Sequence, residues 1–129
     1  MHIGSRLGLV FAVAVLVGTT PAAAQGKAPA AGPTPALAQK GDSIFHGPGL
    51  CYACHGANAQ GAVGPNLTDA EWIHGDGSYD FIVATVTSGI PKEKAKGGVP
   101  MPPKGGSSIS DDDVKAVAAY VYSLSHKLQ

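Results

Sequence analysis

Two thiols and an imidazole lie within five consecutive residues, Cys51-Tyr-Ala-Cys-His55, and the 129-residue chain has no other cysteine. A disulfide, a zinc site, a redox-active dithiol and a covalent haem anchor can each begin with such a group. The residues around the motif have to distinguish these four chemistries.

The first three chemistries are each poorly supported by those surroundings. A closed zinc site needs four ligands, commonly two pairs, and the chain has no second cysteine pair. The spacing of His46, His74 and His126 does not suggest that they complete a site with the motif. A thioredoxin-like dithiol needs a strand–helix unit, whereas glycine-rich segments flank this motif on both sides. A structural disulfide would suit an exported protein, but it would leave His55 unexplained.

Haem attachment gives all three side chains a role. In a helical turn, Cys51 lies three residues from Cys54 and four from His55, so all three point to one side. The thiols can then form thioether bonds to the porphyrin, and His55 can reach the iron as the proximal ligand. We therefore predict one haem c, bound through Cys51 and Cys54.

Met101 is the candidate for the sixth iron ligand. It lies within Val99-Pro-Met-Pro-Pro103, and a backbone stiffened by prolines on both sides suits a ligand better than a flexible core filler. A thioether also raises the potential relative to a second histidine. His74 is the competitor, and would give a bis-histidine site of lower potential. The predicted metal ligands are His55 and Met101.

The elements that must position these residues are short helices joined by long loops. A helix is predicted from about Ala36 until Gly47-Pro-Gly49, and a short one after the capping pattern Thr68-Asp-Ala-Glu71, ending by Gly75. A third is expected over 79–88, capped by Ser78, and a fourth after Ser110, whose first turn is acidic. Residues 90–108 are so rich in glycine and proline that no regular element is expected there. The predicted fold class is all-α.

The N-terminus is predicted to direct export. Arg6 precedes a short apolar run that ends in small residues, as in a secretory signal peptide over 1–24. Residues 25–35 are rich in Ala and Pro and indicate a flexible linker, which leaves 36–129 as the folded domain. The predicted location is the periplasm, with an uncleaved N-terminal anchor as the alternative.

Charge and composition narrow the function further. Removal of the signal peptide leaves eight lysines against nine acids, a formal charge of −1 with neutral histidines, which does not support nucleic-acid binding. The chain is small and poor in aromatic residues, so its own core is limited. This composition favours a large apolar cofactor at the centre of the domain.

The motifs, taken in order, resemble those of the class I c-type cytochromes, over roughly Leu37 to Leu128. They are Cys51-Tyr-Ala-Cys-His55, Gly64-Pro-Asn-Leu67, Pro100-Met-Pro102 and Ala119-Tyr-Val121. The resemblance implies a small cytochrome c fold wrapped around one haem. It also implies that Pro65 offers its carbonyl to His55, and that Gly41 and Phe45 meet Tyr120 where the terminal helices cross. Asn66–Trp72 is similar to cytochrome domains of bacterial respiratory complexes.

The predicted function is outer-sphere electron transfer by a carrier that is not an enzyme. Trp72 is assigned to the haem site, either packing on the macrocycle or donating to a propionate. The expected partners are a cytochrome-reducing complex or dehydrogenase as donor and a terminal oxidase or reductase as acceptor, with membrane contact only through partners or an uncleaved N-terminus. Two alternatives are an electron-accepting subunit of a dehydrogenase or oxidase and a haem-based sensor or peroxidase-like enzyme. Lysines 92, 94, 96 and 104, which flank Met101, are a candidate docking rim.

Overall fold

Helices form where a capping side chain meets an apolar stripe. The computed structural model describes residue 4 and residues 32–128, so all but one residue of the predicted signal peptide and most of the predicted linker lie outside the described residues. Thr34 caps α1 (Pro35–Phe45), which begins one residue before the predicted start. Ser78 caps α3 (Tyr79–Ser88) and Ser110 caps α4 (Asp111–Ser123), as predicted.

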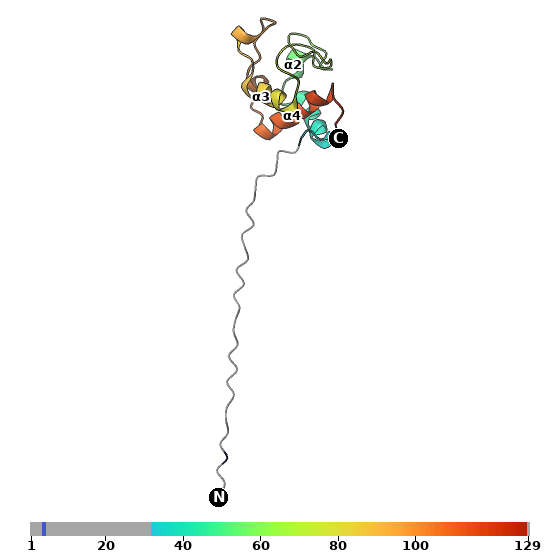
Figure 1. The fold of residues 1–129 in the computed structure, drawn as a ribbon. Helices are drawn as coiled ribbons and strands as arrows, with labels where there is room; N and C mark the ends of the chain where they lie inside the picture. The colour runs from blue at the N-terminus through green and yellow to red at the C-terminus, as the bar shows by residue number, and fades with distance from the viewer. Residues whose placement is uncertain (1–3, 5–31, 129) are drawn as a thin grey trace.

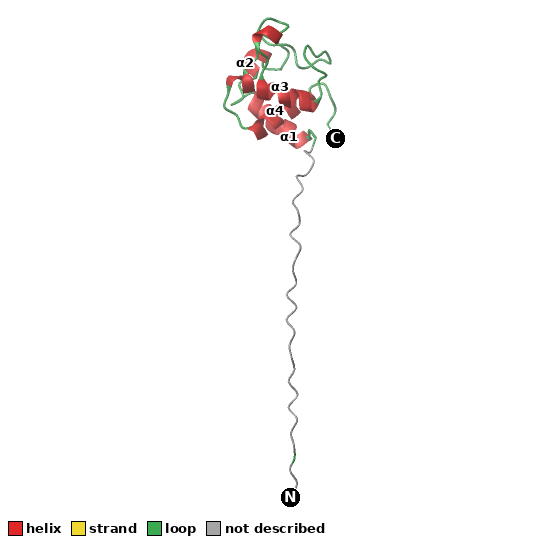
Figure 2. Ribbon diagram, turned by 60° about the vertical axis from the view of Figure 1, so that its left-hand side comes forward, coloured by secondary structure: helices red, strands yellow, loops and turns green. Residues whose placement is uncertain are grey.

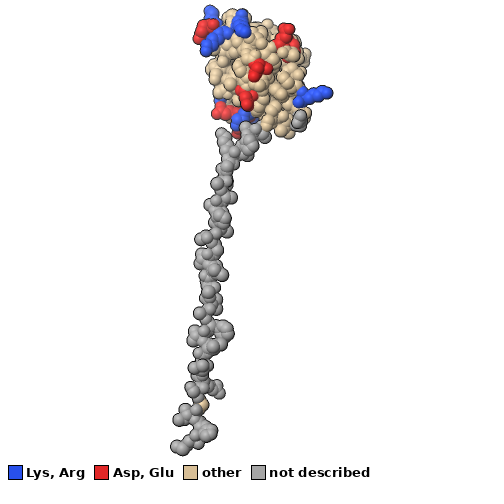
Figure 3. Space-filling view, viewed as in Figure 1, with Lys and Arg blue, Asp and Glu red and all other residues tan. Residues whose placement is uncertain are grey.

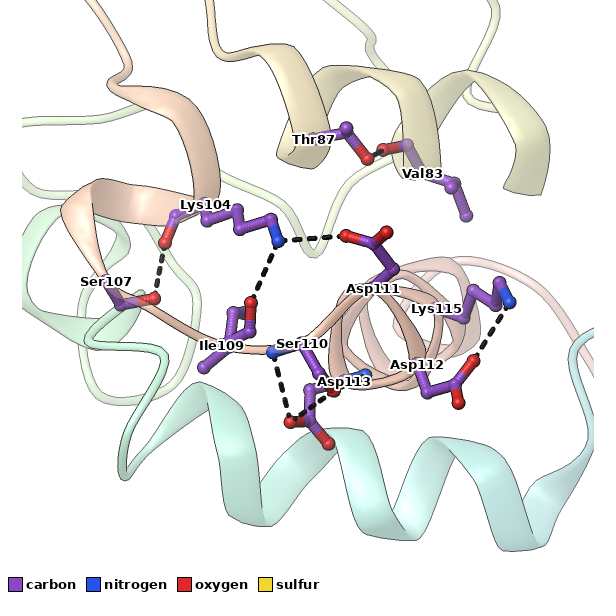
Figure 4. Close-up of polar contacts among 10 residues, drawn as sticks. All are labelled: Val83, Thr87, Lys104, Ser107, Ile109, Ser110, Asp111, Asp112, Asp113 and Lys115. Atoms are coloured by element: carbon purple, nitrogen blue, oxygen red, sulfur yellow. Dashed lines mark hydrogen bonds and ion pairs between the residues drawn. The ribbon is translucent and has the colours of Figure 1, made fainter.

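The N-terminus of α4 is fixed by a reciprocal capping box. The Ser110 hydroxyl accepts from the Asp113 amide at 3.1 Å, while the Asp113 carboxylate accepts from the Ser110 amide at 3.3 Å. Lys104 reaches the same region, where its Nζ donates to the Ile109 carbonyl and pairs with Asp111 at 2.8 Å (Figure 4). These contacts tie the loop after Met101 to the start of α4.

Three helices form the core of the described region. Helix α4 packs against both α1 and α3, and the three gather together while loops make up much of the opposite side (Figures 1 and 2). A side chain at Gly41 of α1 would collide with the Ala116 carbonyl of α4, so this glycine permits the close crossing. The Phe45 ring lies 5.2 Å from the Tyr120 ring, centroid to centroid, at the same crossing. The largest side chains that are fully buried are Phe45, Val114 and Val117.

The helix predicted after Thr68 does not form, and that prediction is wrong. The Asn66 side chain accepts from the Thr68 amide at 2.9 Å, and the Asp69 side chain accepts from the Glu71 amide at 3.1 Å. These local turns occupy the amides that a first helical turn would leave for a cap. The remaining α-helix is instead α2 (Tyr52–His55), which holds the predicted haem-attachment motif except for Cys51, its N-cap.

The segment 90–108 is more regular than predicted. It contains two short 3₁₀ helices, η1 (Lys92–Lys94) and η2 (Pro103–Gly106), and an antiparallel bridge between Ile90 and Met101. A 3₁₀ turn needs only a few residues, so it survives a glycine and proline density that excludes a longer helix. The described residues otherwise contain no strand, and the fold is all-α. None of the helices in residues 32–128 is both long enough and apolar enough to cross a bilayer.

Candidate functional site

The attachment segment begins directly after the turn that ends α1. Leu50 adopts a left-handed conformation with φ of 56°, and Cys51 then starts the single turn of α2. The His55 amide donates to the Cys51 carbonyl at 3.0 Å, which places both cysteines and His55 on one turn. Both cysteines are free thiols: Cys51 is buried and Cys54 is exposed. Burial raises the pKa of the Cys51 thiol to about 11.

His55 is held in one orientation by a backbone carbonyl. Its Nδ1 lies 2.9 Å from the Pro65 oxygen and donates to it, so Nε2 carries the free lone pair. The side chain is 9% exposed, and burial lowers its pKa despite the opposing effect of the Pro65 carbonyl. The imidazole is therefore neutral near pH 7, the form that binds a metal.

Gly64 determines how closely the loop approaches the imidazole. A Cβ at this position would lie 2.9 Å from Cε1 of His55, which is too close for any side chain. The Gly64 amide also donates to the Cys54 carbonyl at 2.8 Å, and the Gly61 amide donates to the His55 carbonyl at 2.8 Å. The loop after the motif is thus hydrogen-bonded back onto the motif itself.

Met101 is positioned by the end of α3. It exchanges two backbone hydrogen bonds with Ile90, of 2.9 and 2.8 Å, and the adjacent Gly89 has a φ of 68°. A side chain at Gly89 would collide with the Met101 carbonyl. Prolines on both sides and this bridge together fix the backbone of Met101. Its side chain is half-buried and packs against the core.

One cavity of about 320 Å³ brings the predicted site residues together. Its lining is mostly apolar and comes from α1, α2, α3, α4 and the loops between them. All six predicted site residues line it: Cys51, Cys54, His55, Pro65, Trp72 and Met101. His74, the predicted competitor of Met101, lines the same cavity, as do Leu50, Leu67, Ile82 and Val86.

The donor set fits a covalently bound haem. The cavity is mostly apolar, and its lining includes two thiols, an imidazole whose Nε2 is free and a thioether. These are the attachment and ligand groups that c-type haem requires. Within residues 32–128, no three His, Cys, Asp or Glu side chains cluster as a metal site would need.

Sequence reasoning missed the apolar residues at the edge of the cavity. Val63, Ile73 and Val99 line it while remaining 61%, 43% and 49% exposed. They belong to irregular loops, where no periodicity indicates which side chains turn inward.

The four lysines of the predicted docking rim differ in their surroundings. Lys104 is paired with Asp111, while Lys92, Lys94 and Lys96 are exposed.

Known proteins with similar sequences are oxidase subunits. The 42% identical subunit CcoP of the cbb3-type cytochrome c oxidase of Rubrivivax gelatinosus matches over 98 residues, covering 72% of this chain and 30% of CcoP. Subunit FixP of the corresponding oxidase of Azorhizobium caulinodans is 40% identical over 98 residues, covering 74% of this chain and 29% of FixP. The chain thus spans about a third of the length of these curated relatives.

The fold is also found in solved cytochrome structures. Cytochrome cL from Methylophaga aminisulfidivorans superposes with a TM-score of 0.55 at 22% identity, covering 69% of this chain and 53% of the other.

The family model described as cytochrome c oxidase, cbb3-type, subunit III matches residues 36–121. This chain therefore belongs to the cbb3-type subunit III family of c-type cytochromes, electron-transport proteins that carry covalently bound haem c.

Proposed function

We propose that this chain passes single electrons to a terminal oxidase as a cytochrome subunit or domain of the oxidase complex. The observation that carries the proposal is the single cavity lined by His55, Met101 and both cysteines. The similarity to CcoP and FixP supports the oxidase-subunit alternative better than the freely diffusing carrier that the sequence favoured.

The residues divide the work of holding the cofactor. Cys51 and Cys54 would attach it covalently, and His55 would bind iron through Nε2 while Pro65 keeps Nδ1 protonated. Met101 would supply a second ligand to the iron from the loop after α3, and Trp72 would pack against the macrocycle. When bound, haem c supplies reversible one-electron chemistry at its iron.

The proposed ligand set favours electron transfer over catalysis. If His55 and Met101 both bind the iron, no coordination position would be left for oxygen, peroxide or a gas. The cavity lining is mostly apolar, and the hydrogen-bonded loop around His55 would limit rearrangement when the iron changes charge. The chain would therefore be an electron carrier rather than an enzyme.

The oxidase assignment is tested by purification from the native membrane. Detergent-solubilised oxidase should retain this chain in a constant ratio through affinity and size-exclusion steps, with one haem c per chain by pyridine haemochrome. Recovery of the chain alone from the periplasmic fraction would instead support the diffusing carrier. Binding of carbon monoxide by the reduced protein would contradict the assignment of Met101 as an iron ligand and favour the sensor or enzyme.

A further inference from the structure

His46 joins the end of α1 to the loop that follows the haem-attachment motif. It is the residue directly after α1, and its Nδ1 lies 2.9 Å from both the carbonyl and a carboxylate oxygen of Asp42. Its Nε2 lies 2.6 Å from the carbonyl oxygen of Ala57, two residues after His55. One ring thus contacts both its own helix end and a loop residue eleven positions further along the chain.

Every atom that faces the ring nitrogens is a hydrogen-bond acceptor. A neutral imidazole has one N–H donor and one lone pair, so it can donate to only one of the two segments. At the other segment its lone pair would face a carbonyl oxygen, which is repulsive. Only the imidazolium form, which has two N–H donors, satisfies the observed geometry.

The surrounding charged and titratable groups agree with that form. On α1 the facing group is Asp42, on α4 it is Tyr120, whose ring lies 6.0 Å from the His46 ring, and the loop contributes the Ala57 carbonyl. The carbonyls of Ala57 and Asp42 raise the pKa of His46, and the Asp42 charge raises it further. Burial and then the Asp42 charge raise the pKa of Tyr120, so its hydroxyl stays neutral while His46 titrates.

The contacted loop is the one that holds His55. Ala59 is fully buried, with a φ of 55°, and its carbonyl accepts from the Leu67 amide at 2.8 Å. The Gly61 amide donates to the His55 carbonyl. A tie at Ala57 therefore restrains the short stretch between the proximal ligand and the buried anchor at Ala59.

We propose that His46 is a positioning residue for the haem-attachment segment, and that it holds the loop to α1 only while both of its ring nitrogens are protonated. The tie is complete below about pH 6.5, the unperturbed range of histidine, and is lost as pH rises through the higher midpoint of the folded protein. The inference does not depend on which redox partner the cytochrome serves.

The test is an imidazole ¹⁵N NMR titration of the reduced holoprotein between pH 5 and 9, with amide hydrogen exchange of Ala59 and Gly61 corrected for intrinsic rates. His46 should carry two protons at pH 6 and titrate above 6.5. Protection of the loop amides should fall roughly three- to tenfold as the proton leaves, the effect of one partly exposed charged hydrogen bond. In His46→Gln, which is uncharged at every pH, that fall should disappear.

His126→Gln is the matched control. His126 is also exposed, but its Nδ1 contacts only Ser125 and Tyr122 of its own terminal turn, so its loss should leave the loop response unchanged. A His46 midpoint at or below 6.5, or an equal fall of protection in His46→Gln, overturns the proposal. If His46→Gln does not fold, the wild-type midpoint and proton count decide by themselves.

Discussion

The orientation of His55 depends on two neighbouring residues that act through their backbone and not through a side chain. Pro65 provides a backbone carbonyl, and Gly64 provides space beside the ring. The hydrogen bond to Pro65 fixes which nitrogen of His55 is free and increases the basicity of the imidazole. The orientation of the proposed iron ligand is thus set by a loop residue ten positions away in the sequence.

Replacing Met101 with Ala tests the second axial ligand. The substitution removes the thioether from the cavity wall while the backbone bridge to Ile90 can persist. We expect the reduction potential of the holoprotein to fall by about 0.1–0.3 V, part of the ~0.8 V range that axial ligands cover. Protein-film voltammetry measures the potential, and carbon monoxide binding reports the opened position.

His74→Ala is the control for this prediction, because His74 lines the same cavity. It should leave the potential nearly unchanged and should not permit carbon monoxide binding. The opposite pattern, in which His74→Ala opens the site and Met101→Ala does not, would assign the sixth position to His74 instead.

At the scale of elements, the crossing of α1 and α4 depends on the absence of a side chain at Gly41. In Gly41→Ala the new Cβ would overlap the Ala116 carbonyl, so the helices must separate. Overpacking of this kind exceeds the gain in helix propensity, and we expect a net loss of about 2 kcal/mol in the free energy of unfolding. Guanidinium denaturation of the holoprotein measures it. Gly32→Ala, with no atom within 4 Å of the added Cβ, should be neutral.

The same two helices are joined by an ion pair whose effect depends on pH. Lys40 of α1 lies 2.7 Å from Asp113 of α4, and hydrogen bonds from Lys40 and then Ser110 lower the pKa of Asp113. A carboxyl with a lowered pKa stabilises the fold above its unfolded pKa of about 3.9, and the contribution disappears as pH falls through the folded value.

Lys40→Gln should therefore lower the urea midpoint modestly at pH 7, and the difference between the two proteins should shrink as pH falls towards 2, because Asp113 loses its charge as pH falls through its lowered folded pKa. Urea titrations at the two pH values provide the measurement. An equal difference at both values would show that Lys40 acts through packing of its aliphatic chain rather than through its charge.

Sequence patterns predicted the helices that have strong caps and failed where side chains formed local turns. Ser78 and Ser110 fixed the starts of α3 and α4, and the structure confirms both. Thr68 and Glu71 also matched a capping pattern, but Asn66 and Asp69 bind the nearby amides instead. A pattern of residue types cannot show which of two competing acceptors a given amide will use.

For the whole molecule, the sequence predicted which candidate site residues lie together more readily than the surfaces around them. The six predicted residues Cys51, Cys54, His55, Pro65, Trp72 and Met101 all line one cavity. The tie from His46 to Ala57 was missed, because a contact between residues eleven positions apart, outside any regular element, has no periodic signal. The apolar edge of the cavity was missed for the same reason.

The last prediction concerns the charged surface. Figure 3 shows small mixed groups of charge on one face rather than a field of one sign. Lys92, Lys94 and Lys96 are nevertheless exposed and close in sequence to the cavity-lining Ala95 and Val99. If these lysines guide a partner, the rate of electron transfer to that partner should fall several-fold between 10 and 200 mM salt, because screening shortens the reach of exposed charges. Replacing all three with Gln should flatten that dependence in stopped-flow measurements.

Lys115→Gln is the control and should preserve the salt dependence, since Lys115 is paired with Asp112 on α4. A rate independent of salt in the wild type would instead assign docking to the exposed apolar residues Val63, Ile73 and Val99, whose contacts with a partner do not depend on ionic strength.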